Sequence, residues 1–344
     1  MKMCKTFGLL LVVGAFCFSL MAQSTEELMS RGNVMLQRGA YSQAVTAFRK
    51  IARRQPSNFE AQYNLAFAYL GWGRNAKAVQ EFKKALGLQP NSSHAWANLA
   101  VAYENMGDIS KALGALDKAV RADPNNITAR VNLAATYANN NQLKKAISEY
   151  MSVIEIDGSN AEVYLALSRC LLSADRTEEA KNYLTEATVA DPQNEEAHWE
   201  LAQIYWKEEK DLDKALTELR LAVDINPEVI RFYNDMARIQ VEQEKKAEAV
   251  KTLKKALVYS DDVLIKEEIQ ANIDMLEGRD TDGGAKSSSA PKFQMKALKR
   301  ESQRDTTKPK RMKTSPVNVD FGDLMGEDSE DENSDLFDFP GQKK

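Results

Sequence analysis

The side chains that most often carry chemistry are scarce in this chain of 344 residues, which has two histidines and three cysteines. Cysteine–histidine dyads and Cys/His zinc sites need these residues in groups, and no Asp, Ser or Cys constellation accompanies His94 or His198 at a useful spacing. Cys170 stands in the apolar run YLALSRCLL, which is typical of a small buried side chain. We therefore predict no catalytic, cofactor-binding or metal-binding residue, and we do not expect an enzyme.

Side chains that suit non-covalent recognition recur at regular spacings instead. Trp199 and Trp206 are seven residues apart, so a helix would present both on one face, and large aromatic side chains are frequent binding anchors. Asn64, Asn98 and Asn132 recur every 34 residues, and an amide both donates and accepts hydrogen bonds along an extended peptide. The alternative is local: each asparagine satisfies backbone groups of its own segment.

The 34-residue spacing extends over most of the chain and indicates an internal repeat. Helix terminators follow it at Pro56, Pro90, Pro124, Gly158, Pro192, Pro227 and Asp261. Paired small residues 12 positions apart, such as Ala100 and Ala112, allow two antiparallel helices to approach to about 8 Å. The separation between Ala202 and Ala215 is 13, which predicts one extra residue in a turn within WKEEKDLDKA.

A helix–turn–helix unit cannot bury its apolar face alone, whereas stacked copies bury one continuous core. The pattern of small and large residues, with Gly73 or Gly107 in the turn and proline at the end, resembles the tetratricopeptide repeat over about residues 25–260. We therefore expect an all-α fold over residues 23–277. The resemblance implies a right-handed α-solenoid of about seven helix–turn–helix repeats, closed by a C-terminal capping helix after Asp261.

The resemblance also implies a partner-binding groove, because first helices line the concave face of such repeats. The predicted groove residues share this face: Trp199, Trp206, Leu165, Arg169, Gln203, Tyr63, Asn64, Phe67, Asn98 and Asn132. Trp199 and Trp206 are the predicted anchors, whereas Trp96 falls in a packing column and is expected to be buried. The competing interpretation is that the two anchors only fill a gap between the fifth and sixth repeats, widened by the extra residue.

The first 22 residues have the layout of a secretory signal peptide. Lys2 and Lys5 precede an uncharged, mostly apolar run that ends at Ala22, a plausible cleavage residue. Cleavage after about Ala22 predicts an exported protein of the periplasm or cell envelope without stable membrane insertion. The alternative is a retained anchor, since a run of roughly 17 residues is at the lower limit for a membrane span.

Residues 278–344 are predicted to be a disordered tail. After a Gly/Ser/Asp-rich linker, residues 292–313 hold nine basic and two acidic side chains, and residues 320–338 hold nine acidic and no basic ones. We name these the basic block and the acidic block. Such blocks are typical of solvated disorder, although the acidic block also carries aromatic residues and resembles segments that dock into partner grooves.

The net charge of −4 produces no global attraction to nucleic acid, and no nucleic-acid partner is expected. The pattern favours a non-catalytic protein–protein interaction scaffold of the periplasm or cell envelope, which binds a protein or peptide in the concave groove without a cofactor. The alternative is an envelope-assembly or surface factor that recognises wall polymer, membrane or another polyanion through the basic block. Polyanion binding should weaken strongly between about 50 and 200 mM salt, unlike groove binding.

Overall fold

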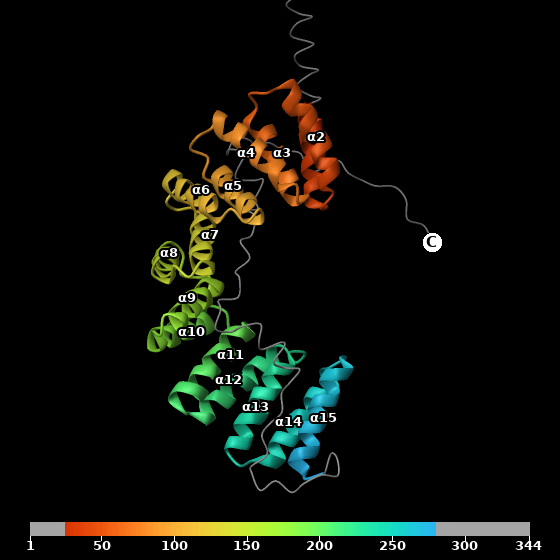
Figure 1. Ribbon diagram of the computed structural model, residues 1–344, viewed down its shortest axis with the longest axis vertical. Helices are drawn as coiled ribbons and strands as arrows, with labels where there is room; N and C mark the ends of the chain where they lie inside the picture. The colour runs from red at the N-terminus through yellow and green to blue at the C-terminus, as the bar shows by residue number, and fades with distance from the viewer. Residues whose placement is uncertain (1–24, 280–344) are drawn as a thin grey trace, which may run out of the picture.

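The computed structural model describes residues 25–279, which are helical and contain no strand (Figure 1). The helices form seven antiparallel pairs and end in one single helix. The pairs are residues 25–37 with α2 (Tyr41–Arg54), α3 (Phe59–Gly71) with α4 (Asn75–Leu88), α5 (Ser93–Asn105) with α6 (Ile109–Ala122), α7 (Ile127–Asn139) with α8 (Leu143–Ile156), α9 (Ala161–Ser173) with α10 (Thr177–Ala190), α11 (Glu195–Ile204) and its extension η1 (Tyr205–Glu209) with α12 (Leu212–Ile225), and α13 (Ile230–Glu242) with α14 (Lys246–Tyr259). The single helix is α15 (Val263–Glu277).

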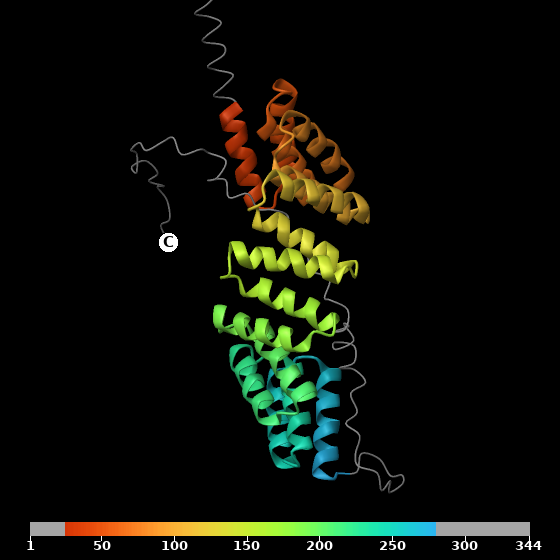
Figure 2. The ribbon, with the colours of Figure 1, turned by 90° about the vertical axis from the view of Figure 1, so that its left-hand side faces the viewer.

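Consecutive pairs stack into a curved solenoid. The first helices of neighbouring pairs contact each other directly, α3 with α5, α5 with α7 and α7 with α9. Figure 1 shows α5 and α7 on the inner side of the arc and α6 and α8 on the outer side, and Figure 2 shows the stack turned by 90°. The expected all-α helical repeat fold is confirmed. The predicted signal peptide and the predicted tail beyond residue 279 lie outside the described residues.

Helix ends follow from capping residues at the repeat period. Asn58, Asn160 and Asn194 each accept a hydrogen bond from a backbone N–H in the first turn of the following helix, as their type predicts. After each first helix one residue adopts a left-handed backbone; Gly73 and Gly107 do so, with φ of 72° and 79°, at little steric cost. Later repeats place other residues there: Asn141, Asp175, Lys210 and Glu244.

The paired small residues lie at the closest approach of the two helices in a repeat. Ala100 and Ala112 are both fully buried. At the first pair a Cβ added to Gly32 would lie 2.5 Å from the Phe48 ring, so the second helix approaches as closely as the glycine allows. The large apolar column of the second helices is buried in every pair: Phe48, Phe82, Leu116, Tyr150, Leu184, Leu219 and Leu253.

The extra residue of the sixth repeat is accommodated in a helix rather than in a turn. Residues Tyr205–Glu209 form a π-helix that continues α11, and Lys210 follows in the left-handed conformation with φ of 59°. A π-bulge inserts one residue into a helix, so the prediction of an insertion in the turn was wrong. Trp206 lies within this π-helix.

The buried core is continuous in the first part of the stack and divided in the second. One cluster of contacting apolar residues runs from Leu36 to Ile204. A second cluster joins α11 and η1 to α12 and α13, and a third joins α13 to α14 and α15. The expected capping helix α15 buries Ile269 and Ile273 against the end of the stack, while Val263 and Leu264 stay exposed.

Candidate partner-binding face

The asparagine column on the first helices joins successive repeats. Asn98 Nδ2 donates a hydrogen bond to the Tyr63 hydroxyl at 2.7 Å, and Asn64 Nδ2 lies 3.6 Å from Met29 Sδ. Both contacts reach the first helix of the preceding repeat, so the purely local interpretation is wrong for these two amides. Asn64, Asn98 and Asn132 are all buried, and a partner reaches them only by displacing protein atoms.

The same column becomes acidic in the last two repeats, where the repeat register places Glu200 and Asp235. Trp199 Nε1 donates to Asp235 Oδ2 at 2.9 Å, and Gln203 Nε2 donates to the same oxygen at 3.0 Å. Burial raises the pKa of Asp235, opposed by the hydrogen bond from Trp199 and by the charge of Arg238. The Trp199–Asp235 contact thus occupies the repeat positions that the Tyr63–Asn98 contact occupies in the second and third repeats. A carboxylate replaces the amide as the partner of the aromatic side chain.

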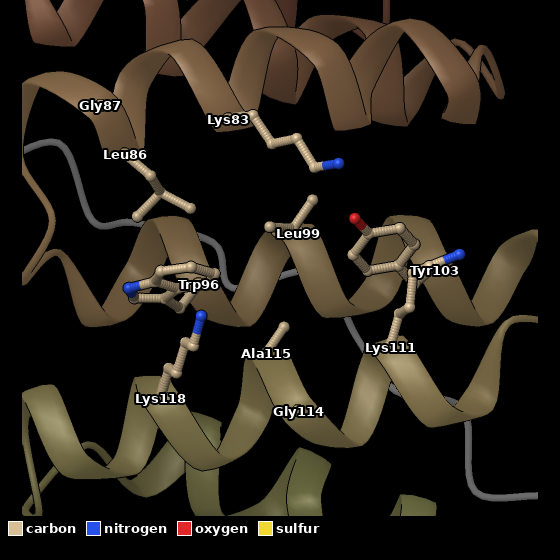
Figure 3. A pocket seen from close by; sticks show the side chains of 10 residues that line it. All are labelled: Lys83, Leu86, Gly87, Trp96, Leu99, Tyr103, Lys111, Gly114, Ala115 and Lys118. Carbon is tan, nitrogen blue, oxygen red and sulfur yellow. The ribbon is translucent and has the colours of Figure 1, made fainter.

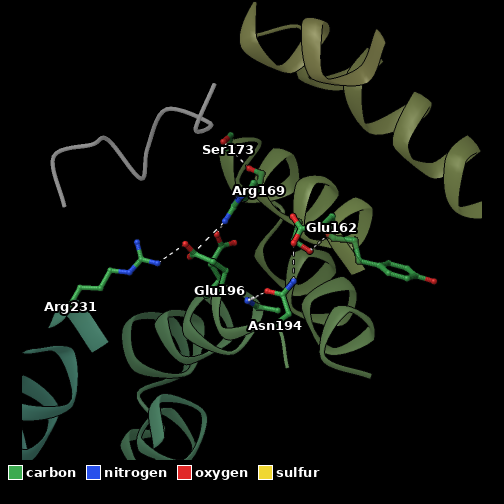
Figure 4. Close-up of polar contacts among 10 residues, drawn as sticks. Glu162, Arg169, Ser173, Asn194, Glu196 and Arg231 are labelled. Carbon is green, nitrogen blue, oxygen red and sulfur yellow. Dashed lines mark hydrogen bonds and ion pairs between the residues drawn. The ribbon is translucent and has the colours of Figure 1, made fainter. Parts of the chain in front are cut away.

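Charged side chains connect the fifth, sixth and seventh repeats on this face (Figure 4). Arg169 on α9 donates through Nε to Glu200 at 2.5 Å and lies 3.8 Å from Glu196. Arg231 on α13 pairs with Glu196 at 2.5 Å, and its guanidinium lies 4.5 Å from the centroid of the Trp199 ring. Burial opposes the charge of Arg169, but Glu200 and Glu196 outweigh it and raise the pKa of that guanidinium.

Trp206 is a packing residue. It is 8% exposed and lies in the apolar cluster with Leu216 and Phe232, while its Nε1 donates to Glu242 at 2.7 Å. It therefore fills the contact between the sixth and seventh repeats, one interface further along than the competing interpretation placed the gap. Of the two predicted anchors, only Trp199 leaves an intermediate part of its surface exposed.

The remaining predicted groove residues lie at two separate positions along the stack. Arg169 and Gln203 lie beside Trp199 and are partly exposed. Tyr63 and Phe67 stack on each other at a centroid distance of 6.4 Å on α3, several repeats away. Tyr63 and Leu165 are buried, and Phe67 is half-buried. The structure therefore brings together only the residues of the fifth and sixth repeats in one cluster.

Sequence reasoning did not find Glu196, Glu200, Arg231 or Asp235. The repeat register gave a usable signal for Glu200 and Asp235, because both fall in the asparagine column. Glu196 and Arg231 share another column, which mixes Glu, His, Thr and Arg along the chain and therefore gave no comparable signal. We name the cluster of Arg169, Glu196, Trp199, Arg231 and Asp235 the inner-face cluster.

Metal binding, membrane insertion and thiol chemistry are not indicated among residues 25–279. No group of three or more His, Cys, Asp or Glu side chains there is placed to hold a metal ion, and no helix in that range combines the length and apolarity that a membrane span requires. Cys170 is buried, and burial raises the pKa of its thiol to about 12. Such a thiol is protonated and inert at neutral pH.

A stack of helix pairs whose first helices form one continuous inner face defines an α-helical repeat protein. Family models of the tetratricopeptide repeat match residues 30–93, 70–126, 106–170, 142–204 and 195–229. The chain belongs to the tetratricopeptide repeat family. No curated protein matches it.

Solved structures agree on the fold. The C-terminal part of a repeat-containing protein from Cytophaga hutchinsonii has a TM-score of 0.60 at 13% identity, covering 70% of this chain and 98% of that one. PilF of Pseudomonas aeruginosa has a TM-score of 0.51 at 20% identity, covering 63% and 98%. A tetratricopeptide repeat protein from Parabacteroides merdae has a TM-score of 0.50 at 17% identity, covering 74% and 99%.

Proposed function

We propose that this protein is a non-catalytic protein–protein interaction scaffold of the periplasm or cell envelope, which binds a protein or peptide on its concave face. Membership of the tetratricopeptide repeat family and the continuous inner face support the scaffold. The placement in the periplasm or envelope rests on the sequence of residues 1–22, which lie outside the described residues.

The inner-face cluster is the observation that carries the proposal. Trp199 offers a partly exposed aromatic surface, and its ring is held between Arg231 and Asp235 by a contact at 4.5 Å and a hydrogen bond at 2.9 Å. Aromatic and arginine side chains that are already held in place lose little freedom on binding, which is the property of interface hot spots. We therefore place the partner's main contact at Trp199, with Arg231 and Arg169 beside it.

Site-specific photo-crosslinking tests this placement. Arg238 is exposed and lies on α13 next to the cluster, with its guanidinium 5.6 Å from the Trp206 ring centroid. A photoreactive residue at position 238 of the full chain, irradiated in native envelope extract, should capture one dominant protein. Capture should be lost in Trp199→Ala, because the aromatic contact is removed.

The matched control is Trp72→Ala, since Trp72 is a tryptophan exposed by 42% at the end of α3. This control should capture the same protein as wild type. Equal capture by Trp199→Ala, or the same captured protein with the photoreactive residue at exposed Ser148 on α8, would contradict the placement. Loss of capture above about 200 mM salt would favour the polyanion alternative.

A further inference from the structure

A cavity of about 470 Å³ opens where α4, α5 and α6 meet. Figure 3 shows Trp96, Leu99 and Tyr103 along α5, with Lys83 reaching in from α4 and two further lysines from α6. Leu86 and Ala115 add apolar surface, and the complete lining holds three lysines and no acidic side chain: Lys83, Leu86, Gly87, Trp96, Leu99, Tyr103, Lys111, Gly114, Ala115 and Lys118. We name it the outer pocket, because it lies between the second helices α4 and α6.

Trp96 was expected to be buried, but it is only half-buried. Its Nε1 donates to the Pro90 carbonyl at 2.8 Å, and one face of the ring lies 4.3 Å from Lys118 Nζ. The same position one repeat later holds Arg130, which donates to the Pro124 carbonyl at 2.7 Å. In both repeats the side chain at this position is therefore fixed on a proline carbonyl, and Trp96 keeps aromatic surface open to solvent.

In the fourth, fifth and sixth repeats a second side chain pairs with the residue at the position of Trp96. Arg130 pairs with Glu149 at 2.8 Å. Tyr164 stacks on Tyr183 at a centroid distance of 6.2 Å. In the sixth repeat His198 Nδ1 lies 2.7 Å from Glu218.

In the third repeat the position of Glu149, Tyr183 and Glu218 is Ala115. Gly87 and Gly114 widen the opening further, because a Cβ added to either glycine would meet nothing within 4 Å. The outer pocket therefore departs from the pattern of the fourth, fifth and sixth repeats.

The lysines leave positive charge at the rim. Lys83 and Lys118 are exposed and their ammonium groups lie near the Tyr103 and Trp96 rings, at 5.9 and 4.3 Å from the centroids. Lys111 pairs with Asp108, the N-cap residue of α6. The lining of the pocket supplies no carboxylate to Lys83 or Lys118. An aromatic and apolar floor under two ammonium groups suits a ligand that carries aromatic side chains among carboxylates.

We propose that the outer pocket binds the acidic block of the same chain together with the adjacent Phe339, residues 320–339. This segment holds nine acidic side chains, no basic one, and the aromatic residues Phe321, Phe337 and Phe339. Its aromatic side chains enter between Trp96 and Tyr103, and its carboxylates pair with Lys83 and Lys118. The basic block is repelled by the same lysines, so charge selects one part of the C-terminal sequence over the other.

The chain is long enough for this contact. Nine helix-to-helix steps separate α6 from α15, which amounts to at most about 90 Å of stacking plus about 20 Å along α15. Residues 280–319 lie between the last described residue and the acidic block, and 40 residues can reach up to about 130 Å when extended. The contact can therefore form within one molecule.

Photo-crosslinking in the full chain tests the proposal. A photoreactive residue at position 114 projects into open space at the pocket, and the same residue at Ser148, one repeat later, is the matched control. We expect crosslinks from position 114 to residues 320–339, and about tenfold fewer from position 148. Absence of these crosslinks, equal yields from both positions, or crosslinks to residues 292–313 would overturn the proposal.

Two variants test the chemistry of the pocket. Ala115→Glu should reduce the crosslinks about tenfold, because the carboxylate fills the floor and repels the acidic block. This variant should fold, since Glu149 and Glu218 occupy the same position in other repeats. Should it unfold in a melting experiment, Lys83→Glu with Lys118→Glu gives the same test on exposed side chains, and unchanged yields from either folded variant would overturn the proposal.

A mixture of unlabelled and ¹⁵N-labelled chains distinguishes binding within one molecule from binding between two. We expect crosslinked peptides that pair only light with light and heavy with heavy, at a yield independent of protein concentration. Mixed light–heavy pairs would mean that the pocket takes the acidic block of a second copy, which would overturn the proposal as stated.

Discussion

The two halves of the stack join their repeats in different ways. In the first half, the first helices meet through a neutral contact, Tyr63 with Asn98, over one continuous apolar cluster. In the second half, the equivalent positions bring together Trp199 and Asp235, and Arg169 pairs with Glu200 nearby. One repeat register therefore supports two kinds of interface, and the charged kind leaves polar and aromatic groups on the inner face for a partner.

The largest expected effect comes from breaking the charged kind of contact. Arg169 and Glu200 are 19% and 10% exposed at their side chains, so Arg169→Met leaves a mostly buried carboxylate without this arginine. We expect a loss of about 3 kcal/mol in the free energy of unfolding, measured by urea denaturation. The double variant Arg169→Met/Glu200→Leu should regain most of it, because it replaces the ion pair by an apolar contact and leaves no buried carboxylate at position 200. No regain would argue against the ion pair as the cause.

Overpacking at equivalent positions should destabilise different lengths of the stack in the continuous and in the divided part of the core. Ala112 and Ala249 occupy the same column and are both fully buried, so a leucine at either position should cost roughly 1–3 kcal/mol. Hydrogen exchange should show loss of protection through α2 to α11 in Ala112→Leu and mainly in α13 to α15 in Ala249→Leu. Gly114→Ala on the exposed side of α6 is the control. An unchanged melting temperature for Ala112→Leu would contradict the register of the repeats.

A smaller effect is expected at the neutral contact of the first half. Tyr63→Phe removes the hydroxyl that accepts from Asn98 at 2.7 Å, and a hydrogen bond between neutral groups contributes about 1 kcal/mol. A double-mutant cycle with Asn98→Ala isolates this coupling from the other contacts of the asparagine. A coupling free energy near zero would show that the tyrosine and the asparagine act independently.

The smallest effect concerns pH. The hydrogen bond to Glu218 raises the pKa of His198, and burial opposes this. A raised pKa in the folded state means that the pair stabilises fully below the ordinary histidine pKa of about 6.5, and that this stabilisation is lost as pH rises through the folded value. The difference in unfolding free energy between wild type and Glu218→Gln should therefore be larger at about pH 5.5 than at about pH 9. An equal difference at both values would show that the pair is uncharged.

The fold could be predicted from the sequence because its determinants are local and periodic. Small residues such as Ala100 and Ala112 mark the closest helix approach, and capping asparagines such as Asn58 mark helix starts. The extra residue before Ala215 was also visible as a break in the period. The sequence did not show that α11 would absorb this residue as a π-helix, because an insertion in a turn and a π-bulge both add one residue to the repeat period.

The candidate site could be predicted only in part. The positions of Trp199, Gln203 and Arg169 follow from the register, and the structure brings these three together. The burial of Trp206 and Leu165 does not follow from the register, because burial depends on the side chains that the neighbouring repeat provides. The outer pocket was missed for the same reason: it results from Ala115 standing where the fourth, fifth and sixth repeats carry a larger side chain.

The affinity of the captured partner for Trp199→Ala tests the central claim most directly, because that claim places recognition on the charged half of the stack. Calorimetric titration of the full chain should show binding weakened by at least about 2 kcal/mol, or about 30-fold, with Trp72→Ala unchanged. Melting curves of both variants ensure that only folded protein is compared. Binding by Trp199→Ala within about twofold of wild type would contradict the claim and would direct attention to Tyr63 and Phe67 in the first half.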